Sequence, residues 1–93
     1  MLKIATRLDP AGPVTLLLAG YLSEDSLAEL ETALDKVRRT HKQISIDLSE
    51  LTLVDRHSLQ FLVAQKRQDI ELINCPEYIE PWIYREASNE LSN

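Results

Sequence analysis

Residues 44–65 read ISIDLSELTLVDRHSLQFLVAQ and join a strand pattern to a helix pattern. Apolar side chains alternate over residues 44–48, which predicts a β-strand that ends in a polar Asp-Leu-Ser turn. A second short apolar run leads to Asp55, a favoured helix N-cap residue. We therefore expect a helix from Asp55 to about residue 67, and a functional surface at the junction between strand and helix.

Two further strand patterns precede this stretch. Residues 2–7 alternate apolar and polar side chains, which predicts a strand with one wet face. Residues 14–19 form a nearly continuous apolar run, as expected for a central strand buried on both faces. The DPAGP turn between them, residues 9–13, predicts an antiparallel hairpin, and the chain is expected to leave the second strand at Gly20.

A helix is predicted between the second and third strands, from Ser23 as N-cap to about Thr40. Acidic residues in its first turn and basic residues near its end complement the helix dipole. Because helices link strands two, three and four, these strands are expected to be parallel. The side chains expected to face the core from the two helices are Leu27, Leu30, Leu34, Val37, Leu59, Leu62 and Val63.

The C-terminal part predicts a fourth strand, Ile70–Ile73, and a third helix. Pro76 suits the first turn of that helix. Pro81 implies either a kink or a helix that begins near Pro81. The side chains expected to pack inward are Trp82, Ile83 and Ala87.

These elements give the order β-β-α-β-α-β-α and an α/β fold class. We expect one domain over residues 1–93, with a four-stranded mixed sheet and about three helices on one face. Hydrophobic residues make up 44% and charged residues 27% of the chain, as in ordinary globular proteins. Aromatic residues are few, so the core should consist mainly of Leu, Ile and Val.

Composition argues against several classes of function. The net charge of -5 argues against a nucleic-acid partner, which would need a basic face. Cys75 is the single cysteine, so an intrachain disulfide cannot form, and a reduced cytoplasmic location is expected. The sequence shows no signal-peptide pattern, and its longest apolar run is too short to span or insert in a membrane.

No cofactor or metal site is expected. His41, His57 and Cys75 are too few for a zinc cluster, and two glycines are too few for a phosphate-binding loop. A catalytic nucleophile pair would need Cys75 together with one of the histidines. We favour the alternative that Cys75 is a small buried or capping residue.

Two other groups of residues allow alternative interpretations. Asp47 and Asp55 could form a carboxylate pair. We favour the alternative that Asp47 ends a strand and Asp55 caps a helix. Trp82 with Tyr78 and Tyr84 would form a docking patch, or Trp82 anchors the last helix to the sheet, which we favour. No arrangement of residues predicts an enzyme.

The junction at Asp55 has free backbone N–H groups. Its carboxylate can accept a hydrogen bond from the N–H of Arg56, His57 or Ser58. A phosphate there would gain from the helix start but would place a dianion beside Asp55. The pattern is therefore typical of a switch, or simply of a well-capped helix.

The chain resembles STAS domains, the fold of bacterial anti-sigma factor antagonists, over nearly its whole length. The resemblance is carried by LLAGYL at 17–22, DLSELTLVD at 47–55, Leu59 with Leu62, and NCP at 74–76. In that family the aspartate is followed by two hydroxyl residues and a glycine. A partner kinase, which is also the anti-sigma factor, phosphorylates one hydroxyl, and the unphosphorylated protein binds that partner.

This chain departs from the family at the hydroxyl positions. Asp55 matches, but Arg56 and His57 replace the hydroxyl residues and Ser58 replaces the glycine. The resemblance thus implies a partner-binding region at Asp55, Arg56, His57 and Ser58, without a phosphate switch at the usual position. Ser58 is either a substitute phosphoacceptor or, as we favour, a first-turn residue whose hydroxyl bonds locally.

Arg56 and His57 also allow two interpretations each. Arg56 is unfavourable at the positive end of a helix, so it either meets an acidic partner or is tolerated because it is solvated, which we favour. His57 either titrates near neutral pH or is an ordinary surface histidine.

The resemblance implies a non-enzymatic regulatory module that binds a protein, such as an anti-sigma factor or kinase-like regulator. Two alternatives stay open: an accessory subunit that binds the ATPase of a lipid-transport ABC system, and a static scaffold domain in a sensory assembly. The sequence does not indicate the oligomeric state.

Overall fold

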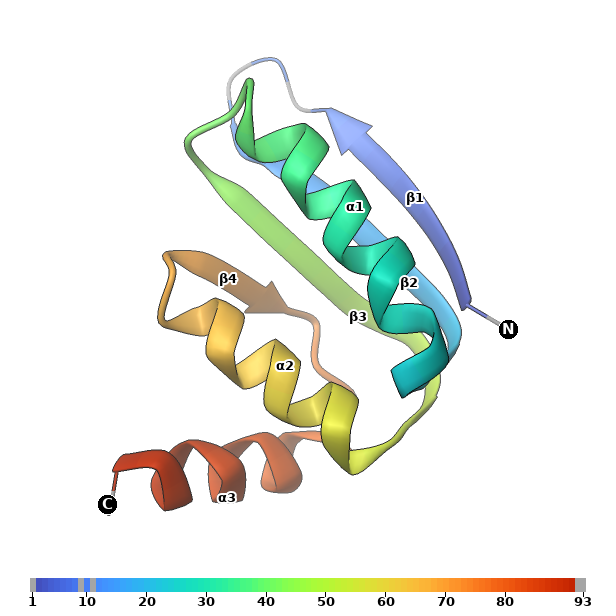
Figure 1. Cartoon of the computed structure of the whole chain (residues 1–93), viewed down its shortest axis with the longest axis vertical. Helices are drawn as coiled ribbons and strands as arrows, with labels where there is room; N and C mark the ends of the chain where they lie inside the picture. Colours follow the sequence, from blue (N-terminus) through green and yellow to red (C-terminus); the bar gives the residue numbers. More distant parts are fainter. Residues whose placement is uncertain (1, 9, 11, 92–93) are drawn as a thin grey trace.

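The computed structural model describes residues 2–8, 10 and 12–91, with side chains described up to residue 86. The predicted order β-β-α-β-α-β-α is confirmed (Figure 1). The elements are β1 (Leu2–Leu8), β2 (Val14–Leu22), the 3-10 turn η1 (Glu24–Ser26), α1 (Leu27–Arg38), β3 (Ile44–Val54), α2 (Arg56–Lys66), β4 (Ile70–Ile73) and α3 (Glu80–Leu91).

The four strands form one mixed sheet in the order β1-β2-β3-β4. β1 and β2 are antiparallel, whereas β2 pairs with β3, and β3 with β4, in parallel, as the helical connections predict. Figure 1 shows α1 and α2 across the same face of the sheet, and α3 packs beside α2.

The core lies between the sheet and the helices. β2 buries both faces over its first half, as its continuous apolar run predicts. The predicted apolar stripes of α1 and α2 are confirmed, since Leu27, Leu30, Leu34, Val37, Leu59, Leu62 and Val63 are all buried. Because branched aliphatic side chains fill this core, the positions of α1 and α2 over the sheet are well defined.

The predicted turn after residue 48 is wrong, because β3 continues to Val54. β3 has 11 residues beside the nine of β2. The two extra residues are absorbed at two bulges, one facing Leu17–Ala19 and one facing Gly20–Tyr21. Bulges break the alternation of side chains, so this part of a strand resembles a turn in the sequence.

The predicted exit of the chain at Gly20 is also wrong, since β2 continues to Leu22. Gly20 has a φ of 98°, in the left-handed region that favours glycine. The glycine therefore lets β2 follow the second bulge instead of ending the strand.

The last helix begins at Glu80, next to Pro81. Of the two alternatives for Pro81, a kink or a helix start, the second is therefore confirmed. Pro76 instead begins a tight turn, in which its carbonyl accepts hydrogen bonds from the N–H groups of Ile79 and Glu80. Ile83 is buried as predicted, but Trp82 is 53% exposed, so its predicted inward packing is wrong. The side chain of Ala87 lies outside the described residues.

Candidate functional site

Asp55 caps α2 as the sequence predicts. It has an extended backbone, and its Oδ1 accepts a hydrogen bond of 2.8 Å from the backbone N–H of Ser58. This bond satisfies one of the free donors at the helix start. The end of β3 and the start of α2 are thereby fixed in one orientation.

The second carboxylate oxygen of Asp55 caps the turn that precedes α1. Its Oδ2 accepts a hydrogen bond of 2.9 Å from the backbone N–H of Glu24. Ser23 occupies the predicted N-cap position, but its side chain makes no capping bond, so the capping role predicted for it is wrong. In addition, the Asp55 backbone N–H donates to the carbonyl of Leu22 at 3.1 Å. One residue therefore joins the starts of both helices and the end of β2.

These contacts affect the ionisation of Asp55. Burial raises the pKa of this carboxyl, but hydrogen bonding from Ser58 and Glu24 and the positive charge of His57 lower it more. The net pKa lies below the ordinary value of 3.8. Asp55 is therefore ionised at neutral pH, as an acceptor of two N–H bonds requires.

Arg56 is largely solvated, as favoured from the sequence, and it also forms an ion pair within the chain. Its Nε lies 3.3 Å from Oε1 of Glu86 on α3, while its side chain stays 75% exposed. The Glu86 side chain is only 8% exposed, and Nε2 of Gln60 contributes a second contact at 3.4 Å. Arg56 thus tolerates the positive helix start because a nearly buried carboxylate neutralises it.

His57 and Ser58 differ in their exposure at the helix start. His57 is exposed, whereas Ser58 is fully buried. The hydroxyl of Ser58 makes no hydrogen bond of ordinary geometry among the described residues, but it interacts with the Asp55 carboxylate and helps to lower the pKa of that group. The local bond favoured from the sequence is therefore present only as a weak contact. A kinase would have to open the start of α2 to reach this hydroxyl.

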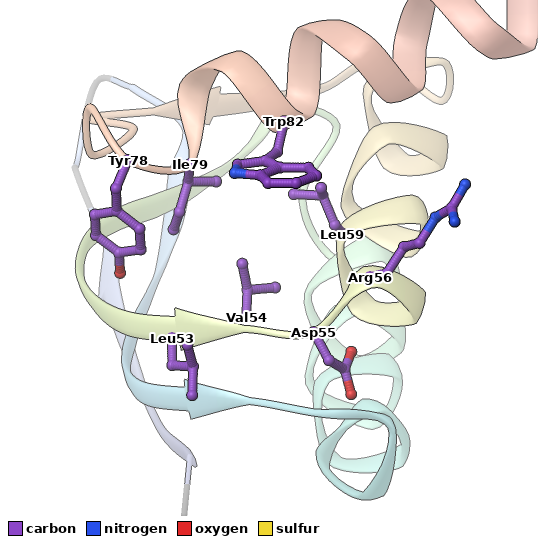
Figure 2. Close-up of a pocket in the computed structure, with 8 residues that line it drawn as sticks. All are labelled: Leu53, Val54, Asp55, Arg56, Leu59, Tyr78, Ile79 and Trp82. Carbon is purple, nitrogen blue, oxygen red and sulfur yellow. The ribbon is translucent and has the colours of Figure 1, made fainter.

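An apolar groove of about 320 Å³, here called the Trp82 groove, lies beside this helix start (Figure 2). One wall consists of Leu53, Val54, Asp55, Arg56 and Leu59. The other wall consists of Tyr78, Ile79 and Trp82. Figure 2 shows Val54, Ile79 and Trp82 directed toward the shared space, while the charged ends of Asp55 and Arg56 point away from it. The interior is therefore apolar.

The sequence identified part of this groove. Of the proposed aromatic patch, Tyr78 and Trp82 line it, but Tyr84 does not and is 76% exposed. The hydroxyl of Tyr78 donates to the backbone carbonyl of Leu51, and burial and the nearby Cys75 raise the pKa of this phenol. The exposure of Leu53, 54%, could have been suspected only once the end of β3 was known.

Other chemically active residues are not brought together. Asp47 accepts hydrogen bonds from the Ser49 N–H at 2.8 Å and from Nδ2 of Asn74 at 2.9 Å. In the described part of the chain it shares no hydrogen-bond partner with Asp55, so the two aspartates do not act as a carboxylate pair. Burial and the negative charge of Glu80 raise the pKa of the Cys75 thiol, which is the wrong direction for a nucleophile. Within the described residues, no group of three His, Cys, Asp or Glu side chains is placed to hold a metal ion.

Along the part of the chain that the structure describes, the helices are too short or too polar to cross a bilayer.

Comparison with known proteins identifies the domain family and the fold. The family described as "Mlab, STAS domain" matches residues 4–77, which include the Asp55 junction and end one residue before Tyr78. No curated protein matches the chain in sequence.

Two solved structures share the fold. The anti-sigma factor antagonist SpoIIAA in its unphosphorylated form superposes with a TM-score of 0.68 and 11% identity, covering 98% of this chain and 99% of that one. The second is an uncharacterised protein of the DUF3478 family from Shewanella loihica PV-4, which has a SpoIIAA-like fold. It superposes with a TM-score of 0.56 and 16% identity, covering 96% of this chain and 79% of that one. At these identities the likeness concerns the fold alone.

Proposed function

Because this chain belongs to the STAS domain family, we propose that it is a non-enzymatic regulatory module that binds a protein partner. The observation that carries the proposal is the double capping by Asp55, with Arg56 and His57 exposed at the start of α2. A helix start held on two sides presents these side chains at low entropic cost, which favours recognition.

The proposed partner is an anti-sigma factor or a kinase-like regulator, and the proposed location is the bacterial cytoplasm. The docking region comprises Asp55, Arg56, His57 and Ser58, with the exposed pair as contacts and Asp55 as support. No phosphate switch operates at the usual position, because Arg56 and His57 have no hydroxyl. The burial of Ser58 supports the same conclusion for the substitute acceptor.

Capture of the partner tests the docking region. The wild-type chain and the variants Arg56→Glu and His57→Glu are used as baits in native lysate from the source organism. Leu8→Glu on β1 is the matched control, because Leu8 is 65% exposed and lies outside the proposed region. We expect one protein to be retained by the wild type and Leu8→Glu, and at least tenfold less of it by the α2 variants. Equal retention by all four baits would overturn the docking region.

A phosphorylation assay tests the loss of the switch. The captured partner is purified and incubated with this protein and ATP, and the products are analysed by mass spectrometry. We expect no phosphate on residues 55–58. A phosphate on any of them would show that the start of α2 opens and that a switch persists.

A second candidate is an accessory subunit of an ABC transporter ATPase. The replacement of both hydroxyls by Arg56 and His57 favours it, since a subunit that stays docked needs no phosphate switch. Identification of an ATPase subunit instead of a kinase-like protein in the capture experiment distinguishes the two. A static scaffold would assemble equally well with Arg56→Glu and His57→Glu.

A further inference from the structure

We propose that the edge of β3 after Asp47 accepts an extended segment of a protein partner, which seats an apolar side chain in the Trp82 groove. This goes beyond the docking region at the start of α2 and does not depend on it. The segment would add to the sheet as a further strand beyond the end of β4, where it would displace the Tyr78 hydroxyl from the carbonyl of Leu51.

The first argument is the unequal pairing of β3. β2 accompanies β3 from Ile44 to Val54, but β4 pairs with β3 only from Ile44 to Asp47. Within the described residues, no strand lies on the β4 side of residues 48–54 (Figure 1). An unpaired strand edge is a template for another extended chain. On this edge the Ser49 N–H donates to Oδ1 of Asp47 and the Leu51 carbonyl accepts from Tyr78, so a partner strand would first use the other backbone groups.

The end of β4 explains why this edge stays open. Asn74 directly follows β4 and has a φ of 53°, which turns the chain out of the extended conformation. Pro76 begins the tight turn that leads to α3. The chain therefore leaves the sheet and returns as the opposite wall of the Trp82 groove.

The second argument is the position of the groove. Figure 2 shows Tyr78, Ile79 and Trp82 across an open space from the end of β3. The Tyr78 hydroxyl already occupies one edge acceptor, the carbonyl of Leu51, so this edge faces the groove. Trp82 and Leu53 are 53% and 54% exposed, respectively. Side chains of an extended segment alternate, so one of each two would enter the apolar space.

Charge defines the partner segment further. Glu50 and Glu77 are exposed, and they are the sequence neighbours of Leu51 and Tyr78, which contact each other. Both acidic residues are therefore close in the chain to the contact between Leu51 and Tyr78. The whole chain has a net charge of -5. The fitting occupant is an extended segment of alternating apolar residues with a basic residue near one end.

Selection from a displayed library of random nonapeptides tests the proposal. Peptides are selected on the full wild-type chain, with counter-selection on Leu53→Glu. Leu8→Glu is the control, because it places the same charge at an exposed leucine of β1, away from the groove. We expect enriched peptides that alternate apolar residues and contain Lys or Arg near one end. Their affinity should fall at least tenfold with Leu53→Glu and Trp82→Ala and should not change with Leu8→Glu.

The enriched peptides also report the mode of binding. They should shift the fluorescence of Trp82, the single tryptophan, and slow amide hydrogen exchange at residues 49–54 at least tenfold. N-methylation of alternate peptide backbone nitrogens should abolish binding, because it removes ladder donors and keeps the side chains.

Three results would overturn the proposal: no enrichment on the wild type over Leu53→Glu, unchanged exchange at residues 49–54, or equal binding by N-methylated peptides. Self-association through this edge, detected by sedimentation and lost with Leu53→Glu, would also overturn it in favour of a second copy. His57 lies outside the groove, so His57→Glu should still bind the selected peptides even if it no longer binds the partner proposed for α2. This variant therefore separates the present inference from the proposed docking region.

Discussion

The carboxylate of Asp55 caps the backbone N–H of Glu24 at 2.9 Å, although 31 residues separate them in the chain. The same carboxylate caps Ser58 within its own helix. The starts of two helices therefore depend on one side chain, and this dependence can be measured.

Asp55→Ala should lower the free energy of unfolding by about 1–3 kcal/mol, because it removes both capping acceptors. Asp55→Asn should cost less, since its one oxygen can still accept the Ser58 N–H while the bond from Glu24 is lost. Ser23→Ala is the control and should cost less than about 0.5 kcal/mol, because Ser23 makes no capping bond. Urea unfolding measures all three. Equal losses for Ser23→Ala and Asp55→Ala would contradict the assignment of the caps.

Stability should decrease in acid through Asp47 as well as Asp55. Burial raises the pKa of Asp47, but hydrogen bonds from Ser49 and Asn74 and the charge of Arg7 bring it below 3.8. Both carboxyls therefore have a lower pKa when folded, so the unfolded chain binds more protons in this range. Their contribution is complete above about pH 5 and is lost as the pH falls through the folded values.

Urea unfolding at a series of pH values checks this direction. The double variant Asp47→Asn with Asp55→Asn should show a flatter dependence below about pH 5 than the wild type. A wild-type stability that stays constant or rises on acidification would contradict the lowered pKa values.

The ion pair between Arg56 and Glu86 should contribute about 0.5–1.5 kcal/mol of coupling energy. This is more than a typical exposed pair, because Glu86 is nearly buried, but exposure of Arg56 limits the gain. A double-mutant cycle with Arg56→Ala and Glu86→Gln measures it. Strictly additive losses would mean that the pair does not hold α3 against α2. The coupling should also weaken at high salt.

Ser58→Ala should raise the free energy of unfolding by about 0.5–1.5 kcal/mol. The change removes a buried hydroxyl that has only a weak contact with the Asp55 carboxylate, and it improves helix propensity. Ser58→Asp should instead lower it by more than about 2 kcal/mol, because a charge would be buried without a partner. Thermal and urea unfolding provide both values. A loss of stability in Ser58→Ala would show instead that the contact of the hydroxyl with the Asp55 carboxylate outweighs this gain.

The sequence predicts the fold well because the deciding signals are local and periodic. The stripes that contain Leu30 and Leu62 identify the core faces of α1 and α2, and the helical connections imply parallel strands. Local periodicity fails where β3 carries bulges, since the extra residues there mimic a turn. The same limit explains why β2 appeared to end at Gly20.

The candidate site is only partly local. The cap from Asp55 to Ser58 spans three residues and could be predicted, whereas the bond to Glu24 and the pair of Arg56 with Glu86 join distant segments. Trp82 was expected inside because large aromatic side chains usually are. It lies half exposed instead, since β4 is too short to fill the space beside β3.

The shared cap also has a consequence for synthesis on the ribosome. Glu24 is translated 31 residues before Asp55, an interval of about 2–6 seconds at the usual rate of about 5–20 residues per second. During this interval the first helix has no carboxylate for that N–H group. The nascent chain therefore completes the start of its first helix only when the beginning of its second has been made.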